Sequence, residues 1–450
     1  MGPVSESVLY RLVPLALVLA FLLLLRGSGF AATEPEAITL ALGFMLMAAF
    51  VAGKGAGRVG LPRISGYLVA GVLIGPHVTN LLTSDMLAAG KAIEGIAVAL
   101  IALTAGGEIR MDWLRREIRS LSVITLLQIA LVGAVTFSIV FFGRDLFPFM
   151  AEVDRTTAAV IALSLAAIAI SNSPTVTIAV ISENRAEGPL SRTVLGVVVL
   201  VDLCVILLFT VTLAFARDVL GGGAEAGSPL VVTLLRHTLG SIAAGCVFGI
   251  GISIFLRRVG REIPVFVLAV CFVIWQTAEQ LHLEALLIAL AAGFWVENFS
   301  AARGEHLIKG IERVSLPVYA LFFATAGAKV DLGALTVMGP LALLLASARA
   351  GSIWLGTRLG AAASPVAPVV KRYAWLGLIS QAGVTLALAA ILARTFPEWG
   401  AGIQTLIVAM IALHELVGPI GFQYGLRRAG EIGATASAPR PPESRDTVPG

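Results

Sequence analysis

The stretch Ile-Ser-Asn-Ser-Pro-Thr-Val-Thr-Ile-Ala at residues 170–179 returns, one residue shorter, as Ile-Ser-Gln-Ala-Gly-Val-Thr-Leu-Ala at residues 379–387. Both copies lie inside long apolar segments, where a helix is the expected structure. In the first copy, Pro174 removes a backbone donor and clashes with the preceding turn, and the neighbouring Asn and Ser side chains can bond the freed backbone groups. Gln381 to Gly383 hold the matched place in the second copy. The pattern predicts two broken helices, with a simple proline kink as the alternative.

The composition is that of a chain surrounded by lipid. Of its 450 residues, 58% are hydrophobic and only 13% are charged, and the mean hydropathy is +0.93. Soluble domains have about a quarter of charged residues, so this chain cannot cover a globule with polar side chains. We see no Lys/Arg cluster with interleaved aromatics, which argues against a nucleic acid partner. No Ser/His/Asp, metal-ligand or phosphate-loop pattern appears either, so we expect neither an enzyme nor a resident cofactor.

Fourteen apolar stretches are long enough, or nearly so, to cross a hydrocarbon core of about 30 Å. They run approximately over residues 10–26, 37–53, 63–80, 88–106, 120–142, 156–182, 192–216, 230–256, 263–279, 282–297, 311–328, 336–360, 372–393 and 402–425. Because backbone groups in lipid must be satisfied within each segment, these stretches are predicted to be helices. Residues 1–36 hold either a signal peptide or an extra helix. The sequence thus predicts an all-α polytopic membrane protein with 13–14 transmembrane helices.

The basic residues of the connecting loops predict the orientation of the chain. When the loop after 37–53 is taken as cytoplasmic and the sides then alternate, 19 Lys and Arg residues fall on the cytoplasmic side and six on the other. This asymmetry predicts a multi-pass protein of the cell (inner) membrane with a cytoplasmic C-terminus. Residues 427–450, rich in Ala, Pro, Ser and charge, are predicted to be a disordered cytoplasmic tail.

Two further pairs of segments match at long range, in the same order as the broken helices. Residues 99–106 resemble residues 320–327, and residues 66–71 resemble residues 289–293. Seven predicted helices separate the members of each pair, so the second copy enters the membrane from the opposite side. The sequence thus predicts inverted-topology repeats, a plan of secondary transporters. The predicted units are a first repeat at 37–216, a linker helix at 217–262 and a second repeat at 263–426.

Asp202 lies in the middle of the apolar stretch 192–216, one predicted helix after the first break. A charge at a helix centre costs about 2.5–3.5 kcal/mol on insertion scales. Such a residue is usually functional or paired, and a carboxyl at this depth can exchange a proton for a cation. The alternative is a neutral Asp that is hydrogen-bonded for packing.

Two further charged residues lie within predicted spans of the second repeat. Arg349 stays charged, so we expect it to be a counter-charge to Asp202 or a support for the broken helices, with snorkelling to an interface as the alternative. Arg358 is nearer the end of the same span and is expected to snorkel. Glu415 lies in the last span, where Gly-Pro at 418–419 can bring it near an interface.

The order of five motifs resembles one known family. They are Gly-Tyr-Leu-Val-Ala-Gly-Val-Leu-Ile-Gly-Pro at 66–76, Ile-Glu-Gly-Ile-Ala at 93–97 leading to Gly107 and Glu108, Phe322-Phe323 followed by Gly327 and Asp331, Ser-Gln-Ala-Gly at 380–383, and Glu-Leu-Val-Gly-Pro at 415–419. Together they are similar to the second branch of the monovalent cation:proton antiporters, which includes sodium/proton exchanger-like and Kef-type transporters. The similarity spans about residues 37–425.

This resemblance implies a homodimer in which a mobile core domain lies beside a gate and dimerisation domain. It implies that Asp202 binds the monovalent cation and the proton, that residues 172–175 and 381–383 cross at the site, and that Arg349 stands where the family has a basic residue. The candidate ion- and proton-binding residues are therefore Asp202, Asn172, Ser173 and Thr175. The supporting residues are Pro174, Arg349, Gln381, Gly383 and Glu415.

Two departures from the family pattern leave the site poor in carboxylates. Val201 stands where members have Asp, Asn or Gln before the key Asp, and Ser173 stands where some have an Asp before the proline. With one titrating Asp, we expect electroneutral exchange of one proton for one Na⁺ or K⁺. The alternatives are a transporter of the same fold for a small organic anion, with Arg349 as the anion contact, and a non-transporting membrane sensor or scaffold.

Overall fold

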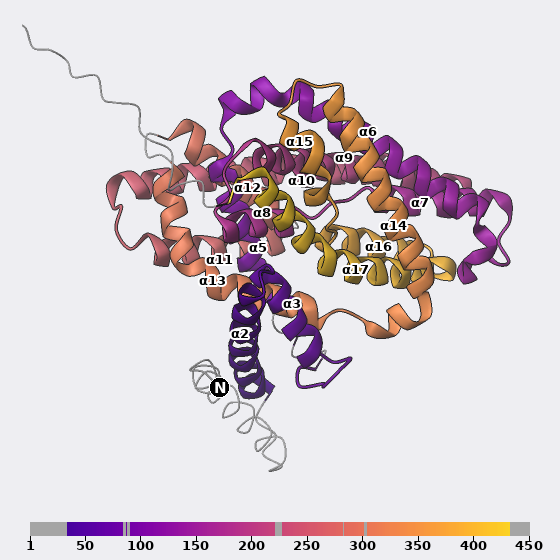
Figure 1. The fold of residues 1–450 in the computed structure, drawn as a ribbon, viewed down its shortest axis with the longest axis horizontal. Helices are drawn as coiled ribbons and strands as arrows, with labels where there is room; N and C mark the ends of the chain where they lie inside the picture. Colours follow the sequence, from indigo (N-terminus) through magenta and orange to yellow (C-terminus); the bar gives the residue numbers. More distant parts are fainter. Residues whose placement is uncertain are drawn as a thin grey trace, which may run out of the picture.

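The structure is a computed structural model that describes residues 34–83, 87, 91–220, 227–281, 283–300 and 304–432. Within these residues it is helical and contains no strand (Figure 1). The helices are α2 (Glu34–Arg58), α3 (Arg63–Ile74), α5 (Lys91–Glu108), α6 (Met111–Phe142), α7 (Arg155–Ala169), α8 (Pro174–Asn184), α9 (Pro189–Val219), α10 (Gly227–Arg258), α11 (Ile263–Leu281), α12 (Ala285–Phe299), α13 (Gly304–Ala328), α14 (Leu332–Ala362), α15 (Pro368–Tyr373), α16 (Gly383–Thr395) and α17 (Pro397–Ala429), with short 3-10 turns η1 (Arg144–Leu146), η2 (Pro148–Met150) and η3 (Ala374–Leu378).

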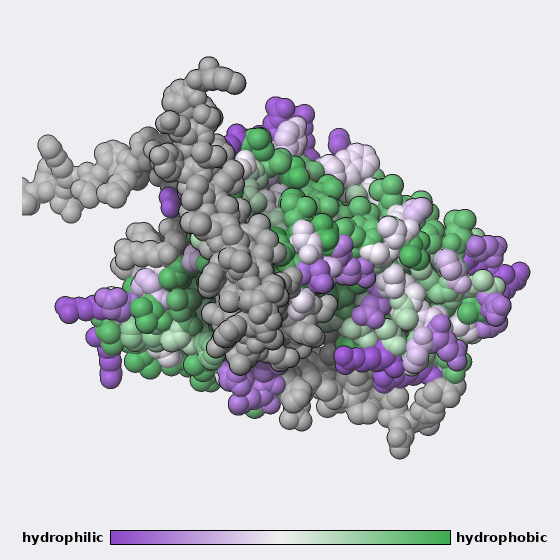
Figure 2. All heavy atoms as spheres, turned by 90° about the horizontal axis from the view of Figure 1, so that it is seen from below, coloured by the Kyte–Doolittle hydropathy of each residue, from purple (hydrophilic) through white to green (hydrophobic). Residues whose placement is uncertain are grey.

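Every predicted apolar stretch from 37–53 onward coincides with a helix or a broken helix, whereas 10–26 lies outside the described residues. Seven helices of the described chain are long and apolar enough to cross a membrane on their own, and five shorter apolar helices accompany them. The seven are Met111–Phe142, Arg155–Asn184, Pro189–Val219, Thr238–Arg258, Ile263–Leu281, Leu332–Ala362 and Pro397–Ala429. Where Figure 2 shows described residues, apolar residues cover broad areas between groups of hydrophilic residues.

One predicted boundary is wrong. α17 continues to Ala429, and the described chain runs on to Ile432, so the start of the predicted tail is ordered. Gly430 adopts the left-handed conformation (φ 73°) that commonly ends a helix. It turns the chain so that Glu431 is buried, with 4% of its surface exposed. Residues 433–450 lie outside the described residues.

The described helices pack as two bundles, and α10 connects the core helix α9 to the scaffold helix α11. The core bundle consists of α6, α7, α8, α9, α14, α15, η3, α16 and α17, and the scaffold bundle consists of α2, α3, α5, α11, α12 and α13. In Figure 1 the scaffold bundle occupies the left and bottom, and most of the core bundle lies to the right. α10 packs mainly along α12.

Two reciprocal glycine contacts hold the scaffold bundle together. A Cβ added to Gly71 of α3 would meet a backbone carbonyl of α13, and one added to Gly327 of α13 would meet a carbonyl of α3. Likewise, a Cβ added to Gly106 of α5 would meet a backbone carbonyl of α12, and one added to Gly293 of α12 would meet a carbonyl of α5. Since Gly71 matches Gly293 and Gly106 matches Gly327 in the sequence repeat, a two-fold operation that exchanges the repeats converts one contact into the other. This arrangement supports the predicted internal symmetry.

A Gly106→Leu variant is expected to lose stability because its Cβ would lie 2.1 Å from the carbonyl oxygen of Leu290, so α5 and α12 must separate. Overpacking of this kind costs roughly 1–3 kcal/mol or more. Thermal unfolding of the purified protein in detergent measures the loss. Gly251→Leu on α10 is the matched control, because nothing lies within 4 Å of its added Cβ. Equal unfolding temperatures for the two variants would contradict the close contact.

Candidate functional site

The two interrupted helices meet at their breaks, as the sequence predicts. The first helix is interrupted between Ala169 and Pro174, and the second between Leu378 and Gly383. The backbone N–H of Ser173 donates to the carbonyl oxygen of Ser380 at 2.8 Å. One turn further on, the Thr177 hydroxyl donates to the carbonyl oxygen of Gly377 at 3.1 Å. The breaks are thus in direct contact, although 209 residues separate matched positions such as 170 and 379.

The first break has the local chemistry of a helix start. Ser173 is the N-cap of α8, and its Oγ accepts from the backbone N–H of Val176 at 3.3 Å. Pro174 follows at the first helical position, where a missing N–H costs nothing. Thr175 places its hydroxyl 3.4 Å from the Ser173 hydroxyl. At the second break, Ala382 precedes α16 and supplies no side-chain cap.

Arg349 is the polar centre of the crossing. It lies on α14 with 1% of its surface exposed. Its guanidinium donates to three backbone carbonyl oxygens at the two breaks, those of Ala169 (2.7 Å), Ser171 (2.7 Å) and Ile379 (2.6 Å). Of the two functional roles predicted for this residue, these contacts match support of the broken helices; none of its hydrogen bonds within the described chain goes to Asp202.

Among the described residues, Arg349 bonds to carbonyl and amide oxygens and to no carboxylate. α7 ends at Ala169, and the α15–η3 segment ends at Leu378, so the carboxyl ends of two helical segments point at one guanidinium. Each helix end has a partial charge of about −0.5. Two such ends offset one positive charge, which explains how an arginine is accommodated at this depth.

Arg349 and Gln128 together fix the amide of Asn172. The Oδ1 atom of Asn172 accepts from Nη2 of Arg349 at 2.9 Å and from Nε2 of Gln128, on α6, at 3.3 Å. Because a guanidinium only donates, the atom that faces it must be the oxygen. Both lone pairs of Oδ1 are then in use, and Nδ2 has no partner among the described residues. The predicted cation-binding role of Asn172 is therefore restricted, because its side-chain oxygen is already occupied.

Gln128 is a site residue that sequence reasoning missed. Its side chain is fully buried, and its Oε1 lacks a partner within the described chain. α14 lies close to it, since a Cβ on Gly356 would come within 2.8 Å of the Gln128 Cα. An isolated Gln in the apolar stretch 120–142 was the available signal. Gln381, in the second break, donates from Nε2 to the carbonyl oxygen of Ala169 at 3.3 Å.

Asp202 lies on α9, part-buried, with an Oδ1 that is buried and has no hydrogen-bond partner among the described residues. α8 and α9 are joined by a short turn and pack together. At 1.5 Å per residue, Asp202 is about 20 Å along α9 from Pro189, and the break before Pro174 is about 15–20 Å back along α8. The carboxyl therefore lies near the level of the break. Glu284, just before α12, is close enough for its charge to act on Asp202, and sequence reasoning missed it as well.

Glu415 lies inside the core bundle rather than at an interface. It is 5% exposed, and His414 beside it is 3% exposed. One turn later, Gly418 packs directly against Ser380, because an added Cβ would come within 2.0 Å of the Ser380 Oγ. α17 thus passes close to the second break, and a carboxyl and an imidazole are buried about one turn from it.

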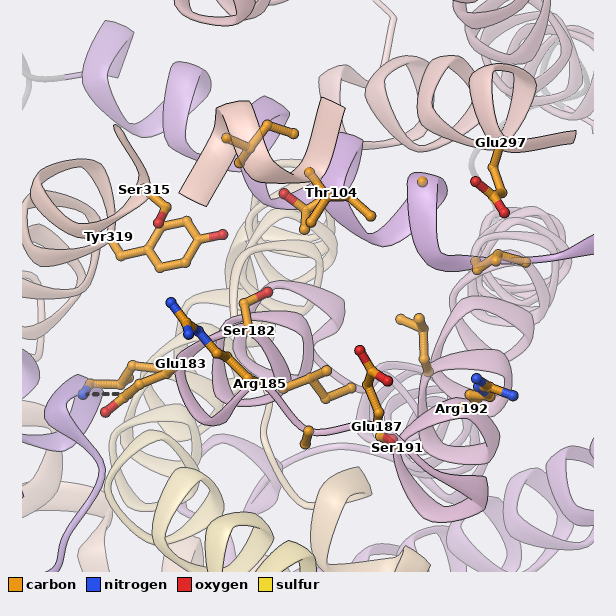
Figure 3. A pocket seen from close by; sticks show the side chains of 18 of the residues that line it. Thr104, Ser182, Glu183, Arg185, Glu187, Ser191, Arg192, Glu297, Ser315 and Tyr319 are labelled. Atoms are coloured by element: carbon orange, nitrogen blue, oxygen red, sulfur yellow. Dashed lines mark hydrogen bonds between the residues drawn. The ribbon is translucent and has the colours of Figure 1, made fainter. Parts of the chain in front are cut away.

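A cavity of about 590 Å³ lies between the two bundles (Figure 3). Both bundles line it, and its wall includes the charged residues Arg63, Arg110, Glu183, Arg185, Glu187, Arg192 and Glu297. It reaches α9 at Leu195, which is two turns before Asp202. The cavity therefore approaches the candidate carboxyl along α9 from the end of the molecule where the loop basic residues predict the cytoplasm.

Comparisons with known proteins agree with this geometry. The family model described as "Sodium/hydrogen exchanger, transmembrane" matches residues 44–423. Among solved structures, the sodium proton antiporter MjNhaP1 from Methanocaldococcus jannaschii, determined at pH 8, matches with a TM-score of 0.64 and 17% identity, covering 88% of this chain and 99% of that chain. No curated protein sequence matches. The structural match shows the shared fold, and the family model covers most of the chain, which therefore belongs to the sodium/hydrogen exchanger family.

Proposed function

We propose that this protein exchanges a monovalent cation, Na⁺ or K⁺, for protons across a membrane by alternating access. Membership in the sodium/hydrogen exchanger family and the likeness to an antiporter fold support this proposal. The observation that carries it is the contact between two helix breaks near the level of the acid Asp202. Arg349 offsets the partial negative charges of the two helix ends at this contact. Broken helices of this kind are the ion sites of secondary transporters.

Asp202 is the group that binds either the proton or the cation. The hydroxyls of Ser173 and Thr175, at the start of α8, are the neutral oxygen ligands that we propose for the cation. Since the Asn172 oxygen is occupied, its amide N–H groups are directed elsewhere and can bond the ionised Asp202 or a water. Movement of the core bundle against the scaffold bundle would expose the carboxyl to each side of the membrane in turn. We propose a homodimer in the inner membrane with a cytoplasmic C-terminus.

The test is cation-driven proton flux in proteoliposomes that contain a pH-sensitive dye. An outward gradient of Na⁺ or K⁺ is expected to acidify the lumen, whereas choline is expected to have no effect. Comparing Na⁺, K⁺ and Li⁺ identifies the substrate. Absence of flux with all three cations in well-folded protein would refute the proposal.

Exchange is expected to be electroneutral, because one carboxyl trades one proton for one monovalent cation. The measurement is a supported-membrane recording in which a Na⁺ or K⁺ jump produces no transport current. Dye-detected flux in the same preparation is the control that the protein is active. A current that follows the flux would require a second titrating group, for which the buried Glu415 and the neighbouring Glu284 are the nearest candidates.

The organic-anion alternative receives no support from the geometry. Four of the five N–H groups of Arg349 are bonded to the breaks and to Asn172. An anion would have to displace these internal bonds, which hold the crossing together.

A further inference from the structure

The carboxylate of Glu183 connects the two bundles. Glu183 lies in the last turn of α8, in the core bundle, and accepts from the backbone N–H groups of Arg63 at 2.5 Å and Ile64 at 3.2 Å. These are the first two residues of α3, in the scaffold bundle. Figure 3 shows this contact at the edge of the cavity. A side chain 120 residues away thus caps the start of α3.

Among the described residues, Glu183 is the side chain that caps α3. Its N-cap residue is Pro62, which has no polar side chain and makes no side-chain cap bond. The first N–H groups of a helix lack intrahelical partners and attract a negative charge. Glu183 is therefore bonded to two donors that the sequence next to α3 leaves unsatisfied.

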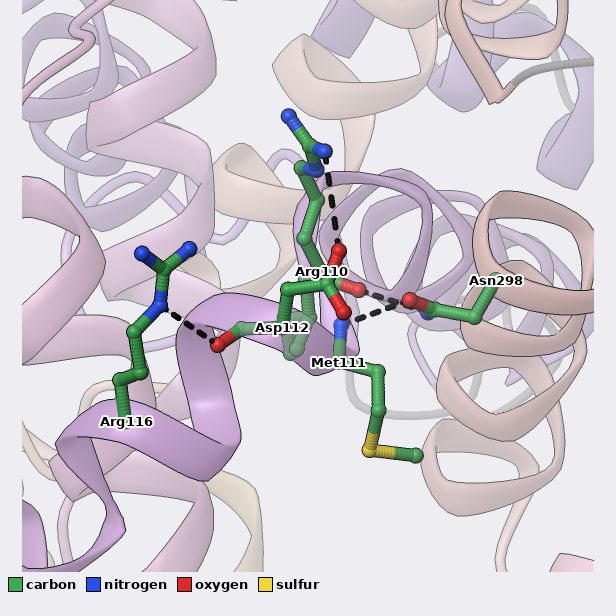
Figure 4. A network of polar contacts seen from close by, with 6 residues as sticks. Arg110, Met111, Asp112, Arg116 and Asn298 are labelled. Atoms are coloured by element: carbon green, nitrogen blue, oxygen red, sulfur yellow. Dashed lines mark hydrogen bonds and ion pairs between the residues drawn. The ribbon is translucent and has the colours of Figure 1, made fainter.

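A second polar tie near the junction of the bundles is of a different kind. Asn298 of α12 accepts from the N–H of Met111 at 2.6 Å and donates to the carbonyl oxygen of Ile109 at 2.9 Å (Figure 4). Ile109 and Met111 belong to the covalent connection between α5 and α6, so at this contact the two bundles are also joined by the chain itself. The Glu183 contact, in contrast, joins segments that can separate.

We propose that Glu183 is a releasable latch that stabilises the conformation in which the cavity is open. The inference rests on the proposed alternating access, because α8 moves with the core bundle while α3 stays with the scaffold bundle. Any shift of α8 along α3 must break both hydrogen bonds. The latch therefore favours the observed conformation over the one that opens to the opposite side, and it contributes nothing once the bundles have moved.

The test is the apparent cation affinity measured from each side of the membrane, in right-side-out and inverted vesicles. The apparent dissociation constant on one side varies inversely with the fraction of protein open to that side. In Glu183→Ala, the ratio of the constant on the cavity side to that on the opposite side is expected to rise roughly 5- to 30-fold, the effect of losing one such tie. Glu183→Gln keeps an acceptor without the charge, so its ratio should lie between those of the wild type and of Glu183→Ala.

A matched control uses the same chemistry inside one bundle. Glu431 accepts from the N–H groups of Leu190 at 2.6 Å and Ser191 at 2.8 Å, at the start of α9. Because α9 and the end of α17 both belong to the core bundle, Glu431→Ala is expected to lower thermal stability and leave the ratio unchanged. A ratio that is unchanged in Glu183→Ala, or changed equally in both variants, would overturn the latch.

A second readout does not depend on transport. In a variant with the three native cysteines replaced, Ser315→Cys places a thiol in the cavity wall on α13. Its labelling by a water-soluble maleimide is expected to slow when Glu183→Ala is added. Wild-type protein that exchanges no cation, with labelling that still slows, would refute the proposed function and keep the latch. Wild-type protein that does exchange cations, with labelling that does not slow in the Glu183→Ala variant, would keep the proposed function and refute the latch.

Discussion

Replacing Arg349 by alanine is expected to cause a severe loss of stability together with a complete loss of transport. The substitution leaves three buried carbonyl oxygens and the Asn172 amide without their common donor. Removing one partner of a buried charged network typically costs about 3–5 kcal/mol. The two helix ends would also face each other with like partial charges. Thermal unfolding in detergent should show a large decrease in the midpoint, and cation-driven proton flux should be lost.

One further variant separates the charge of Arg349 from its geometry, and another serves as the control. Arg349→Lys keeps the positive charge but replaces the planar five-donor fork by a compact ammonium, so partial stability with weak transport is expected. Arg358→Ala on the same helix is the control, because Arg358 is exposed and lies over the Trp354 ring. If Arg349→Ala unfolds at the same temperature as Arg358→Ala, the crossing does not depend on the guanidinium.

Asp202→Asn is expected to abolish exchange and leave the fold intact. The amide has nearly the shape of the carboxyl but neither titrates nor supplies a negative charge to a cation. Proton flux driven by Na⁺ or K⁺ should therefore fall to the level of protein-free liposomes. Any cation-dependent rise in unfolding temperature should vanish as well, because a ligand stabilises only the protein that binds it.

The control for this loss is Asp218→Asn, since Asp218 lies on the same helix but is exposed. It should keep wild-type flux. Unchanged flux in Asp202→Asn would mean that another group binds the proton and the cation, and Glu415→Gln would then be the next variant to measure.

The positions of the breaks and of Asp202 could be predicted because each is a polar exception in an apolar segment. Pro174 and the residues around it interrupt a hydrophobic run, and a carboxyl in the middle of a span is rare enough to stand out. The repeat was visible for a related reason, since Gly71, Gly106, Gly293 and Gly327 lie where two helix backbones touch and a side chain would not fit. Each of these features is visible within a short stretch of sequence, so it can be recognised without knowledge of the tertiary fold.

The partners of the site residues could not be predicted. Arg349 binds backbone carbonyls, which every residue has and no motif marks. Glu183 and Glu431 cap helices that begin 120 and about 240 residues away, so their contacts depend on the tertiary fold. The composition after Arg428 resembles that of a disordered segment, yet one left-handed glycine directs Glu431 onto α9.

The internal balance of Arg349 bears on how the membrane voltage acts on this protein. Carrying one elementary charge through a potential of 100 mV involves about 2.3 kcal/mol. Arg349 and the two helix ends that offset it belong to the same bundle, so they would travel together as a nearly neutral unit. Displacing that bundle would then do little electrical work, and the cost of each half-cycle would be set by the occupant of the carboxyl alone.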